Sequence, residues 1–487
     1  MMHIEQTATG CIIRNPSTEI KRKVLQYFSL KQPVREFFIY SGNDPDHPPI
    51  FGKERDVLYI SSGFLHIVDP IIQKETRFKK TSQPPMGAKI SLSLSKEPRS
   101  DFQRDCTKVM ITTKARKLTI EAKAGLGKTF MAMYAISKLG LKPLIIAPTT
   151  MLKSQWTREF IEEGIPKEKI TNNIYEAPNY DFCIVTITSL ENAMRDDWNG
   201  LMKVIKEANF GIKIIDEAHL HLKGMLRFDA ICNIARNWYL SATLGRSDEA
   251  EDNILNRALL DAERFVGSKK YIEYQKEYIN VYYQDCYYNM SARLCEEYFK
   301  YGTKGLIKST YYNALMAYQN GIPFISNILT VYKLMRHIMP EDVRDKKALI
   351  LVPMITIIER LVETMKQDPY FKNIHIIGVD GRMKIVEKMA ALSEGELIIS
   401  TSMSMGTGID IKGMSLLINF DQYASPIISE QIVGRNRDRG WECYHVDVVD
   451  YVKYAKTLAS WGNKRRGCLP YFPGVKKNFK QLPDLRK

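Results

Sequence analysis

Short apolar runs alternate with stretches of helical spacing in the first half of the chain. Residues 118–121 form a short apolar run, and residues 130–139 repeat apolar positions at helical intervals without Gly or Pro. Residues 212–215 form a second apolar run that ends in two adjacent carboxylates, Asp216 and Glu217. The pattern predicts strands at 118–121 and 212–216 and a helix at 130–139.

The first hundred residues show a different pattern. Aromatic and apolar clusters at 27–29, 37–40 and 57–68 surround a turn-rich segment at 42–49. This pattern favours a small α+β module. The Pro- and Ser-containing residues 81–100 then predict a linker.

The composition predicts a globular chain of about three domains, since domains commonly hold roughly 100–200 residues. The chain has 487 residues, of which 45% are hydrophobic and 26% charged, so it is neither disordered nor fibrous. No apolar run approaches the ~18–20 residues of a membrane span, and the first residues lack the regions of a signal peptide. We therefore expect a cytoplasmic protein, with a monomer favoured.

Eight scattered cysteines form no C-x-x-C pair and lie near no histidine at zinc-ligand spacing. We expect them to be reduced and mostly buried, because free Cys behaves as a small apolar residue.

Basic charge is concentrated at the two ends of the chain. The net charge is +15. Residues 1–100 carry 15 Lys and Arg against 10 acids, and residues 452–487 carry 10 against 1. Basic flanks suit a protein held on a polyanion, because contacts of Lys and Arg with phosphates release counterions. The alternative is a solvated basic surface without a partner.

A phosphate-binding loop fills the space between the first predicted strand and helix. Residues 122–129 read A-K-A-G-L-G-K-T, with Ala122 where the pattern G-x-x-x-x-G-K-[ST] has its first Gly. Two glycines let the backbone approach phosphate oxygens, the lysine reaches the β- and γ-phosphates, and the threonine hydroxyl is a magnesium ligand. The sequence predicts an ATP site with Mg²⁺ at Ala124, Gly125, Leu126, Gly127, Lys128 and Thr129.

The carboxylates that end the second strand complete this chemistry. Asp216 can hold the magnesium shell, and Glu217 can orient or deprotonate the attacking water. Because ligands bind outside the carboxyl ends of parallel strands, we expect both motifs at the same sheet edge.

Further motifs follow in a fixed order. The first half holds A-P-T at 147–149 with Q-W at 155–156, T-I-T-S-L at 186–190, D-E-A-H at 216–219, and S-A-T at 241–243 before Arg246. The second half holds A-L-I-L-V-P at 348–353, S-T at 400–401, G-T-G-I-D at 406–410 and Q-I-V-G-R at 431–435. Together they resemble motifs I to VI of the DEAH-box helicases of superfamily 2, over about residues 101–451.

This resemblance implies two RecA-like lobes, each a mostly parallel sheet with helices on both faces, that clamp ATP and shift a nucleic-acid strand on hydrolysis. It implies catalytic roles for Lys128, Asp216, Glu217 and the motif VI arginines. Gln103 resembles the glutamine that reads adenine, and Gly408 and Asp410 of motif V are implied to contact nucleotide. The resemblance implies that Thr149, Thr188 and Thr401 contact nucleic acid. From the basic end of the chain, we expect Lys464, Arg465 and Arg466 to do the same.

Motif VI departs from the family pattern Q-x-x-G-R-x-x-R. Asp438 stands where the second arginine is expected, and Arg437 and Arg439 flank it. We favour Arg437 as the partner of Arg435, because it falls in a turn that could begin a helix after the motif, whereas Arg439 precedes Gly440. Alternatively, Arg435 works alone and Arg437 pairs with a surface acid.

The layout predicts an accessory, DNA-binding module at 1–100, lobe 1 at 101–265, lobe 2 at 266–455 and a basic tail at 456–487. A small module ahead of such a motor is similar to the UvsW-like phage recombination helicases and, more distantly, to RecG-type fork remodelers. If the chain is phage-encoded, it would act in the bacterial cytoplasm. The alternative is that the module only stabilises lobe 1.

The leading functional hypothesis is an ATP-driven DNA helicase that remodels forks and four-way junctions and also binds single-stranded regions. One alternative is an RNA helicase, although the DEAH box and the Gln155-Trp156 pair favour DNA. A second is the motor subunit of a restriction nuclease, for which no nuclease motif is evident. A third, a binding module with a dead ATP site, conflicts with the intact motifs I and II.

A tyrosine-rich segment holds eleven of the 26 tyrosines within residues 271–312. Aromatic side chains can stack on exposed bases. Their alternation and helical spacing favour core packing instead.

Overall fold

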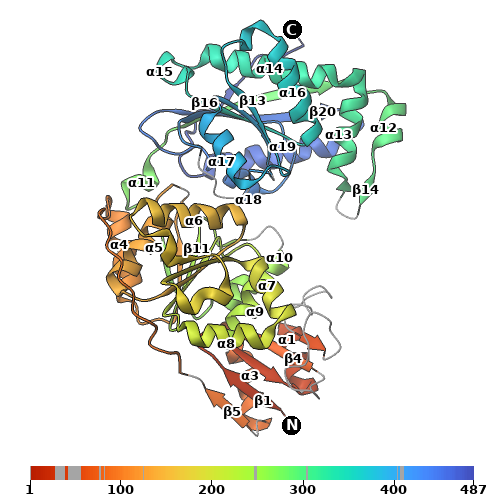
Figure 1. Ribbon diagram of the computed structural model, residues 1–487. Helices are drawn as coiled ribbons and strands as arrows, with labels where there is room; N and C mark the ends of the chain where they lie inside the picture. The colour runs from red at the N-terminus through yellow and green to blue at the C-terminus, as the bar shows by residue number, and fades with distance from the viewer. Residues whose placement is uncertain are drawn as a thin grey trace. The chain divides into compact units, whose positions relative to one another are not determined.

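The computed structural model describes residues 2–27, 39–41, 56–75, 78–81, 83–123, 125–245, 249–302, 305–402, 404–405 and 411–486. They fall into two compact units, Met1–Glu273 and Tyr274–Lys487 (Figure 1). Among these residues, no helix combines the length and the hydropathy that a membrane span requires. All eight cysteines are free and seven are buried, which confirms the expectation for them.

The first unit begins with a small five-stranded sheet of order β3-β4-β2-β1-β5. β1 pairs antiparallel with β2 and parallel with β5. The predicted α+β module is therefore confirmed, while residues 28–29, 37–38 and 42–49 lie outside the described part. Its elements are β1 (His3–Gln6), β2 (Gly10–Arg14), α1 (Thr18–Tyr27), β3 (Ile39–Ser41), β4 (Asp56–Ser61), α3 (Leu65–Glu75) and β5 (Phe78–Thr81).

This module is docked on the rest of its unit through buried contacts. The Thr9 hydroxyl donates to the backbone oxygen of Asp229 at 2.7 Å, and the Ser61 hydroxyl to that of Ala258 at 2.9 Å. A Cβ on Gly10 would lie 2.4 Å from the Cα of Ala230, so only glycine permits this approach. One hydrophobic core joins β1, β2 and β4 to the larger sheet. The module therefore stabilises the first lobe, whatever else it binds.

Residues 83–100 connect the module to the motor without behaving as a free linker. The backbone nitrogen of Ala88 donates to Asn209 at 2.7 Å, and that of Ile90 donates to Gly140 at 3.1 Å. Gly87 has a φ of +84° and lies against Gly211. The segment is therefore fastened along the first large sheet at several points.

The first large sheet has seven parallel strands in the order β12-β6-β11-β10-β7-β9-β8. Strands covered on both faces are built from continuous apolar runs, and every residue of β10 is buried. The strands are β6 (Lys117–Glu121), β7 (Pro143–Ala147), β8 (Ile170–Thr171), β9 (Phe182–Thr186), β10 (Ile212–Asp216), β11 (Arg236–Ser241) and β12 (Glu263–Val266). Its helices are α4 (Asp101–Thr112), α5 (Lys128–Leu139), α6 (Thr150–Glu162), α7 (Ile187–Asp196), α8 (Trp198–Ala208), α9 (Leu222–Ile231) and α10 (Glu249–Ala258).

The second unit contains another seven-stranded parallel sheet, of order β17-β18-β16-β19-β20-β13-β21. The predicted fold class, two tandem parallel α/β lobes with a small N-terminal module, is thus confirmed. The strands are β13 (Ile279–Tyr288), β16 (Lys347–Val352), β17 (Ile376–Val379), β18 (Leu397–Thr401), β19 (Met414–Asn419), β20 (Cys443–Val452) and β21 (Lys480–Gln481). Its longer helices are α13 (Lys308–Ala317), α14 (Ile322–Ile338), α16 (Ile355–Gln367), α17 (Ile385–Glu394), α18 (Pro426–Val433) and α19 (Lys456–Cys468).

The interval predicted to be a basic tail is folded into this second unit. Helix α19 packs on β20 so closely that a Cβ on Gly462 would lie 2.4 Å from a methyl of Val449. Downstream, β21 pairs in parallel with β13. Truncation at residue 460 would therefore remove part of the lobe itself.

Most tyrosines of the tyrosine-rich segment pack in or beside the core, as expected, while Tyr287 and Tyr301 are exposed. Tyr282 and Tyr288 of β13 and the neighbouring Tyr311 and Tyr312 of α13 are buried. Because side chains alternate along a strand, Tyr287 points to the other face, and 41% of its surface is exposed.

Candidate nucleotide and nucleic-acid sites

The phosphate loop follows β6 and leads into α5. Gly125 and Gly127 have φ values of +90° and +83°, a backbone region that favours glycine. Ala122 is buried and is not among the described residues of positive φ, which explains why alanine replaces the expected first glycine. Ala124 lies outside the described residues. The loop leaves the first amides of α5 free to face an anion.

Lys128 and Thr129 open the helix and contact the neighbouring acids. The Lys128 ammonium lies 3.3 Å from the backbone oxygen of Ala122 and 3.7 Å from a carboxylate oxygen of Glu217. The Thr129 side chain is near Glu159 of α6, and burial raises the pKa of Glu159. Motif I and motif II therefore meet at one edge of the sheet, as predicted.

Asp216 ends β10 as a buried carboxylate. Burial, and next the charge of Glu217, raise the pKa of Asp216 to about 6. The indole nitrogen of Trp156 donates to Asp216 at 2.9 Å, and the Glu217 amide donates to its other oxygen at 3.0 Å. These donors hold the carboxylate in one orientation.

Glu217 adopts a left-handed backbone, with a φ of +47°. This conformation costs a non-glycine residue free energy and is most often found at functional sites. It turns the chain sharply after β10, so that Asp216 and Glu217 are both directed to the carboxyl edge of the sheet. His219 of the same turn lies 2.8 Å, through Nδ1, from the hydroxyl of Ser241. Motifs II and III are thereby linked side chain to side chain.

Mg²⁺ with ATP fits this set of residues. A threonine hydroxyl and a buried carboxylate are the oxygen ligands that Mg²⁺ takes beside phosphates and water. A cation would also offset the cost of burying Asp216 next to Glu217. Thr129 and Asp216 are the residues that would hold the ion.

Gln103 lies where an adenine reader is expected, close to the phosphate loop. Its side-chain nitrogen donates to the backbone oxygen of Leu126 at 2.9 Å, and its side-chain oxygen accepts from the Arg99 amide at 3.0 Å. Its nitrogen would lie 2.8 Å from a Cβ on Gly127. Gln103 therefore supports the loop, and its contact with adenine stays a prediction.

Trp156 and Glu159 are the functional residues that sequence reasoning missed in this lobe. The Gln155-Trp156 pair served only as a family marker. A signal was present in the spacing, since residues 155 and 159 of one helix face the same side, and Gln155 donates to Glu159 at 2.7 Å. Helix α6 thus supports the magnesium ligands from behind.

Motif VI begins in the last turn of α18 and ends in the loop before β20, so it does not open a new helix. Asp438 accepts the Gly440 amide at 3.1 Å, and Gly440 has a φ of +85°, so the chain reverses here. The helix argument that favoured Arg437 over Arg439 is therefore wrong. Asp438 pairs with Lys276 at 2.7 Å.

Burial, followed by the nearby charge of Arg437, lowers the pKa of Arg435 to about 10. These two arginines are thus electrostatic neighbours in an environment poor in water. Such a pair gains most from an added anion. Arg437 as the partner of Arg435 therefore stays a prediction.

The three threonines of the expected nucleic-acid path lie at carboxyl ends of strands. Thr149 caps α6 and accepts the Leu152 amide at 3.2 Å. Thr188 is exposed in the first turn of α7, and Thr401 ends β18 with its hydroxyl donating to Ser404 at 2.7 Å. Their contact with nucleic acid stays a prediction. Arg246, Gly408 and Asp410 lie outside the described residues.

Two of the three predicted basic residues at 464–466 of α19 bond to acids of the sheet. Arg465 is buried at 1% exposure and bonds Asp447 at 2.9 Å. Arg466 pairs with Asp447 and with Asp285, the latter at 2.8 Å. Burial closes Arg465 to nucleic acid, contrary to the prediction. Arg466 is partly buried and paired with two carboxylates, and its contact with nucleic acid stays a prediction. Lys464 is exposed.

Comparison with known proteins supports these assignments. The family model described as "Type III restriction enzyme, res subunit" matches residues 95–246. The model described as "Helicase conserved C-terminal domain" matches residues 330–438. The chain is 21% identical over 447 residues to transcript termination protein A18 of Yaba-like disease virus, covering 86% of this chain and 85% of the relative. It is 22% identical to transcript termination protein OPG145 of monkeypox virus, covering 77% and 73%.

Solved structures support the fold. S. cerevisiae Dbp5 bound to RNA and ADP BeF3 is similar with a TM-score of 0.54 at 16% identity, covering 79% of this chain and 90% of that one. Mss116p bound to ssRNA and AMP-PNP is similar with a TM-score of 0.52 at 14% identity, covering 80% and 75%. With both family models matched in order and the motor motifs in place, the chain is an ATP-dependent helicase of superfamily 2.

Proposed function

We propose that this helicase moves along DNA and displaces the RNA strand of transcription intermediates. The observation that carries the proposal is the extent of the likeness to the two poxvirus relatives, whose names describe transcript termination. The alignment with A18 covers 86% of this chain, far beyond the two segments that the family models match. Regions outside the motor are therefore included in the likeness.

The catalytic arrangement suits repeated turnover of ATP. Lys128 neutralises phosphate charge, and Glu217 is placed to orient and deprotonate water. Mg²⁺ held at Thr129 and Asp216 would neutralise further phosphate charge. Trp156 keeps the Asp216 carboxylate oriented while these groups act.

The contacts expected with nucleic acid favour movement along a strand without reading its sequence. Thr149, Thr188 and Thr401 offer small hydroxyls at strand ends, which suit backbone phosphates and not base edges. An enzyme of this kind can displace whatever is annealed to the strand on which it moves. The RNA of an RNA–DNA hybrid is one such cargo.

Remodelling of branched DNA remains a second candidate function. The feature that favours it is the small α+β module ahead of the motor, a layout similar to UvsW-like helicases. Its docking on the first lobe through Thr9 and Gly10 would let it act as a fixed wedge. The module's contact with DNA is part of this candidate.

Two substrates tested side by side separate the candidates. The first is a DNA bubble carrying an annealed RNA, and the second is a four-way DNA junction; both are incubated with the full chain and ATP. We expect ATP-dependent release of the RNA at a higher rate than junction unwinding. Glu217→Gln is the control for hydrolysis. Faster unwinding of the junction would replace the first proposal with the second.

ATPase rates identify the strand on which the motor moves. Single-stranded DNA, single-stranded RNA, duplex DNA and an RNA–DNA hybrid are compared at saturating ATP. We expect the greatest stimulation by DNA. Stimulation by RNA alone would make the chain an RNA helicase.

A further inference from the structure

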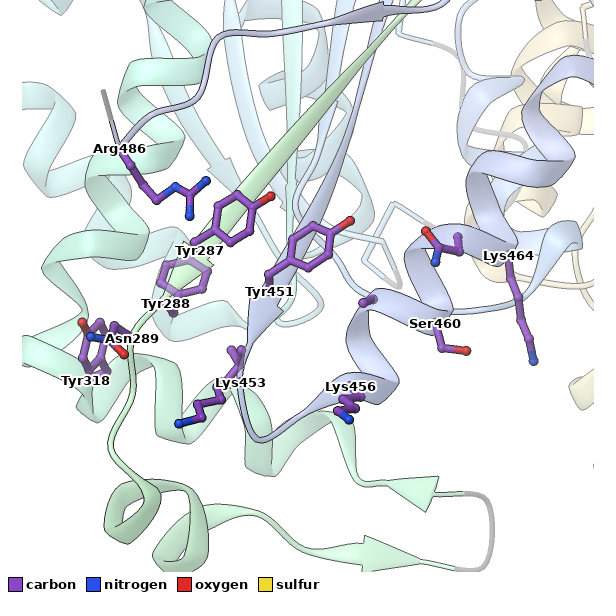
Figure 2. Close-up of a pocket in the computed structure, with 13 residues that line it drawn as sticks. Tyr287, Tyr288, Asn289, Tyr318, Tyr451, Lys453, Lys456, Ser460, Lys464 and Arg486 are labelled. Carbon is purple, nitrogen blue, oxygen red and sulfur yellow. The ribbon is translucent and has the colours of Figure 1, made fainter.

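The second unit carries a groove whose lining residues all lie outside the helicase motifs. It has a volume of about 1240 Å³ and lies where β13 and β20 end and α19 begins (Figure 2). Thirteen described residues line it; four of these are Lys or Arg and none is acidic. The basic residues are Lys453, Lys456, Lys464 and Arg486.

Aromatic rings form one wall of the groove. β13 and β20 are parallel and place Tyr287 directly beside Tyr451, with the rings stacked at 4.9 Å and 19°. The Arg486 guanidinium lies 3.7 Å from the centre of the Tyr287 ring and is held by Asp484 at 2.6 Å. Figure 2 shows these groups in a row, guanidinium, Tyr287 and then Tyr451.

Helix α19 supplies basic and small side chains to the groove. Lys456, Ser460 and Lys464 recur every four residues and therefore share one face of the helix, with Ala459 and Asn463 beside them. The opposite face, with Leu458, is buried against the sheet. The groove is therefore formed by elements that the fold holds in place: helix α19, which packs on the sheet, and the paired strands β13 and β20.

We propose that this groove binds single-stranded nucleic acid. A base would stack on the outer face of Tyr451, which Tyr287 and Arg486 support from behind. The backbone would be held by Lys453, Lys456 and Lys464. Stacked aromatics combined with cations that follow the backbone are the usual means of binding single strands without reading sequence. An acidic peptide would satisfy the lysines but not the planar rings. The proposal extends the proposed function and rests on it.

The position of the groove fits a strand that also meets motif V. All strand pairs of this sheet are parallel, so Thr401 at the end of β18 and Tyr451 near the end of β20 lie at the same edge. They are three strand spacings apart, roughly 14 Å, and Tyr451 lies about 10 Å farther along the strand direction. That span is on the order of five stacked nucleotides. The groove would hold the strand after it leaves the motor.

The test measures the affinity of the full chain for labelled oligouridylate, oligothymidylate and duplex DNA by fluorescence anisotropy at two salt concentrations. The single strands are long enough to reach both Thr401 and the groove. We expect Tyr451→Ala and Tyr287→Ala each to weaken single-strand binding roughly tenfold and to leave duplex binding unchanged. Tyr451→Phe should retain wild-type affinity. The two single strands decide between RNA and DNA as the ligand.

The lysines are tested separately through the salt dependence. Lys453→Gln combined with Lys456→Gln should lower the slope of log affinity against log salt by about 1.4, or 0.7 for each lost phosphate contact. Lys366→Gln with Lys372→Gln removes the same charge from exposed positions elsewhere in the unit and should leave the slope unchanged. Tyr301→Ala, 60% exposed on β14 (Tyr301–Gly302), is the matched aromatic control.

Several outcomes would overturn the proposal. Wild-type affinity for single strands in both tyrosine variants would show that no base stacks on these rings. An equal loss of affinity for duplex DNA would also contradict stacking of a single strand. If polyglutamate displaces the labelled single strand equally well from the wild type and from the tyrosine variants, the groove binds acidic proteins instead. Melting temperature and the ATPase rate without nucleic acid serve as checks of folding. If wild-type ATPase responds to no nucleic acid, the proposed function fails; if it responds but the variants bind normally, only the groove is rejected.

Discussion

The two seven-stranded sheets share one architecture and carry different chemistry at their carboxyl edges. The first sheet gathers acids, a lysine and a glycine-rich loop, all in contact with one another: Lys128 lies 3.7 Å from Glu217, and Trp156 bonds Asp216. The second gathers lysines, Arg486 and tyrosines there, with Tyr287 stacked on Tyr451. Its motif VI arginines lie at the opposite edge, beside the starts of β13 and β20. The first edge suits a metal–phosphate group, and the second carries the groove that we propose to bind a single strand.

This difference shows how one fold is divided between hydrolysis and nucleic-acid binding. In the first sheet, one cation, Lys128, lies among two carboxylates, Asp216 and Glu217, so the site has an excess of negative charge that Mg²⁺ would offset. At the carboxyl edge of the second, four Lys and Arg side chains line one groove and no acid lines it. The following predictions alter one edge at a time, so that each effect can be assigned to hydrolysis, folding or binding.

The largest effect is expected at motif VI. Arg435→Ala should lower nucleic-acid-stimulated turnover by ~10³-fold or more, because an arginine that stabilises the transferring phosphoryl group contributes about 10³–10⁵ in rate. Arg437→Ala should follow closely and Arg439→Ala should have little effect. Steady-state ATPase with a check of ATP binding measures this. A severe loss only at Arg439 would reverse the order.

Glu217→Gln should reduce turnover by roughly 10²–10⁴-fold and leave ATP binding intact, since the general base acts on water and not on the nucleotide. The measurement is a single-turnover assay together with nucleotide titration. Glu162→Gln, an exposed acid of α6, serves as the control and should turn over at the wild-type rate. Loss of nucleotide binding in the Glu217 variant would show that the residue holds the nucleotide instead.

Arg465→Met should destabilise the second unit by about 3–5 kcal/mol, because it leaves Asp447 buried without its main partner. Denaturant unfolding measures the change. Lys464→Met, one residue away on the exposed face, should change stability by less than about 0.5 kcal/mol. Equal effects of the two substitutions would mean that Arg465 is not the anchor of α19.

The contrast between these neighbours shows what the sequence could and could not predict. The strands at 117–121 and 212–216 and the helix at 128–139 follow from local periodicity, and the magnesium ligands follow from motif spacing. The charge run Lys464, Arg465 and Arg466 was misinterpreted because successive helix residues turn by about 100°. The acids that neutralise two of them, Asp285 and Asp447, are far away in sequence.

The groove was missed for the same reason. Tyr287, Tyr451 and Arg486 come from three distant segments that only the strand order β20-β13-β21 brings together. Alternation along β13 does indicate that Tyr287 faces away from Tyr288, but not what it faces. Similarly, the Asp438 turn could not be distinguished from a helix start, since Gly440 and its φ of +85° decide it only in the fold.

Trp156→Phe should lower turnover by ~10- to 100-fold, mostly through a weaker apparent affinity for Mg²⁺, because the groups that orient a metal ligand typically contribute that much. The phenyl ring retains packing against Phe160 and removes only the indole donor. ATPase is measured over a magnesium titration. A change in melting temperature with no change in the magnesium dependence would assign Trp156 to the core alone.

The smallest effect is expected at Lys464, the one residue of the charge run that stays exposed. Lys464→Gln should weaken single-strand binding only a few-fold and lower the salt slope by about 0.7, the value of one phosphate contact on a single strand. Lys477→Gln, also exposed but outside the groove, should leave the slope unchanged. Anisotropy titrations at several salt concentrations resolve such a change where a single affinity would not. A lysine that contacts phosphate contributes to the salt slope, whereas a solvated lysine does not. A wild-type slope for Lys464→Gln would therefore limit the binding surface of the groove to Lys453, Lys456 and the tyrosine pair.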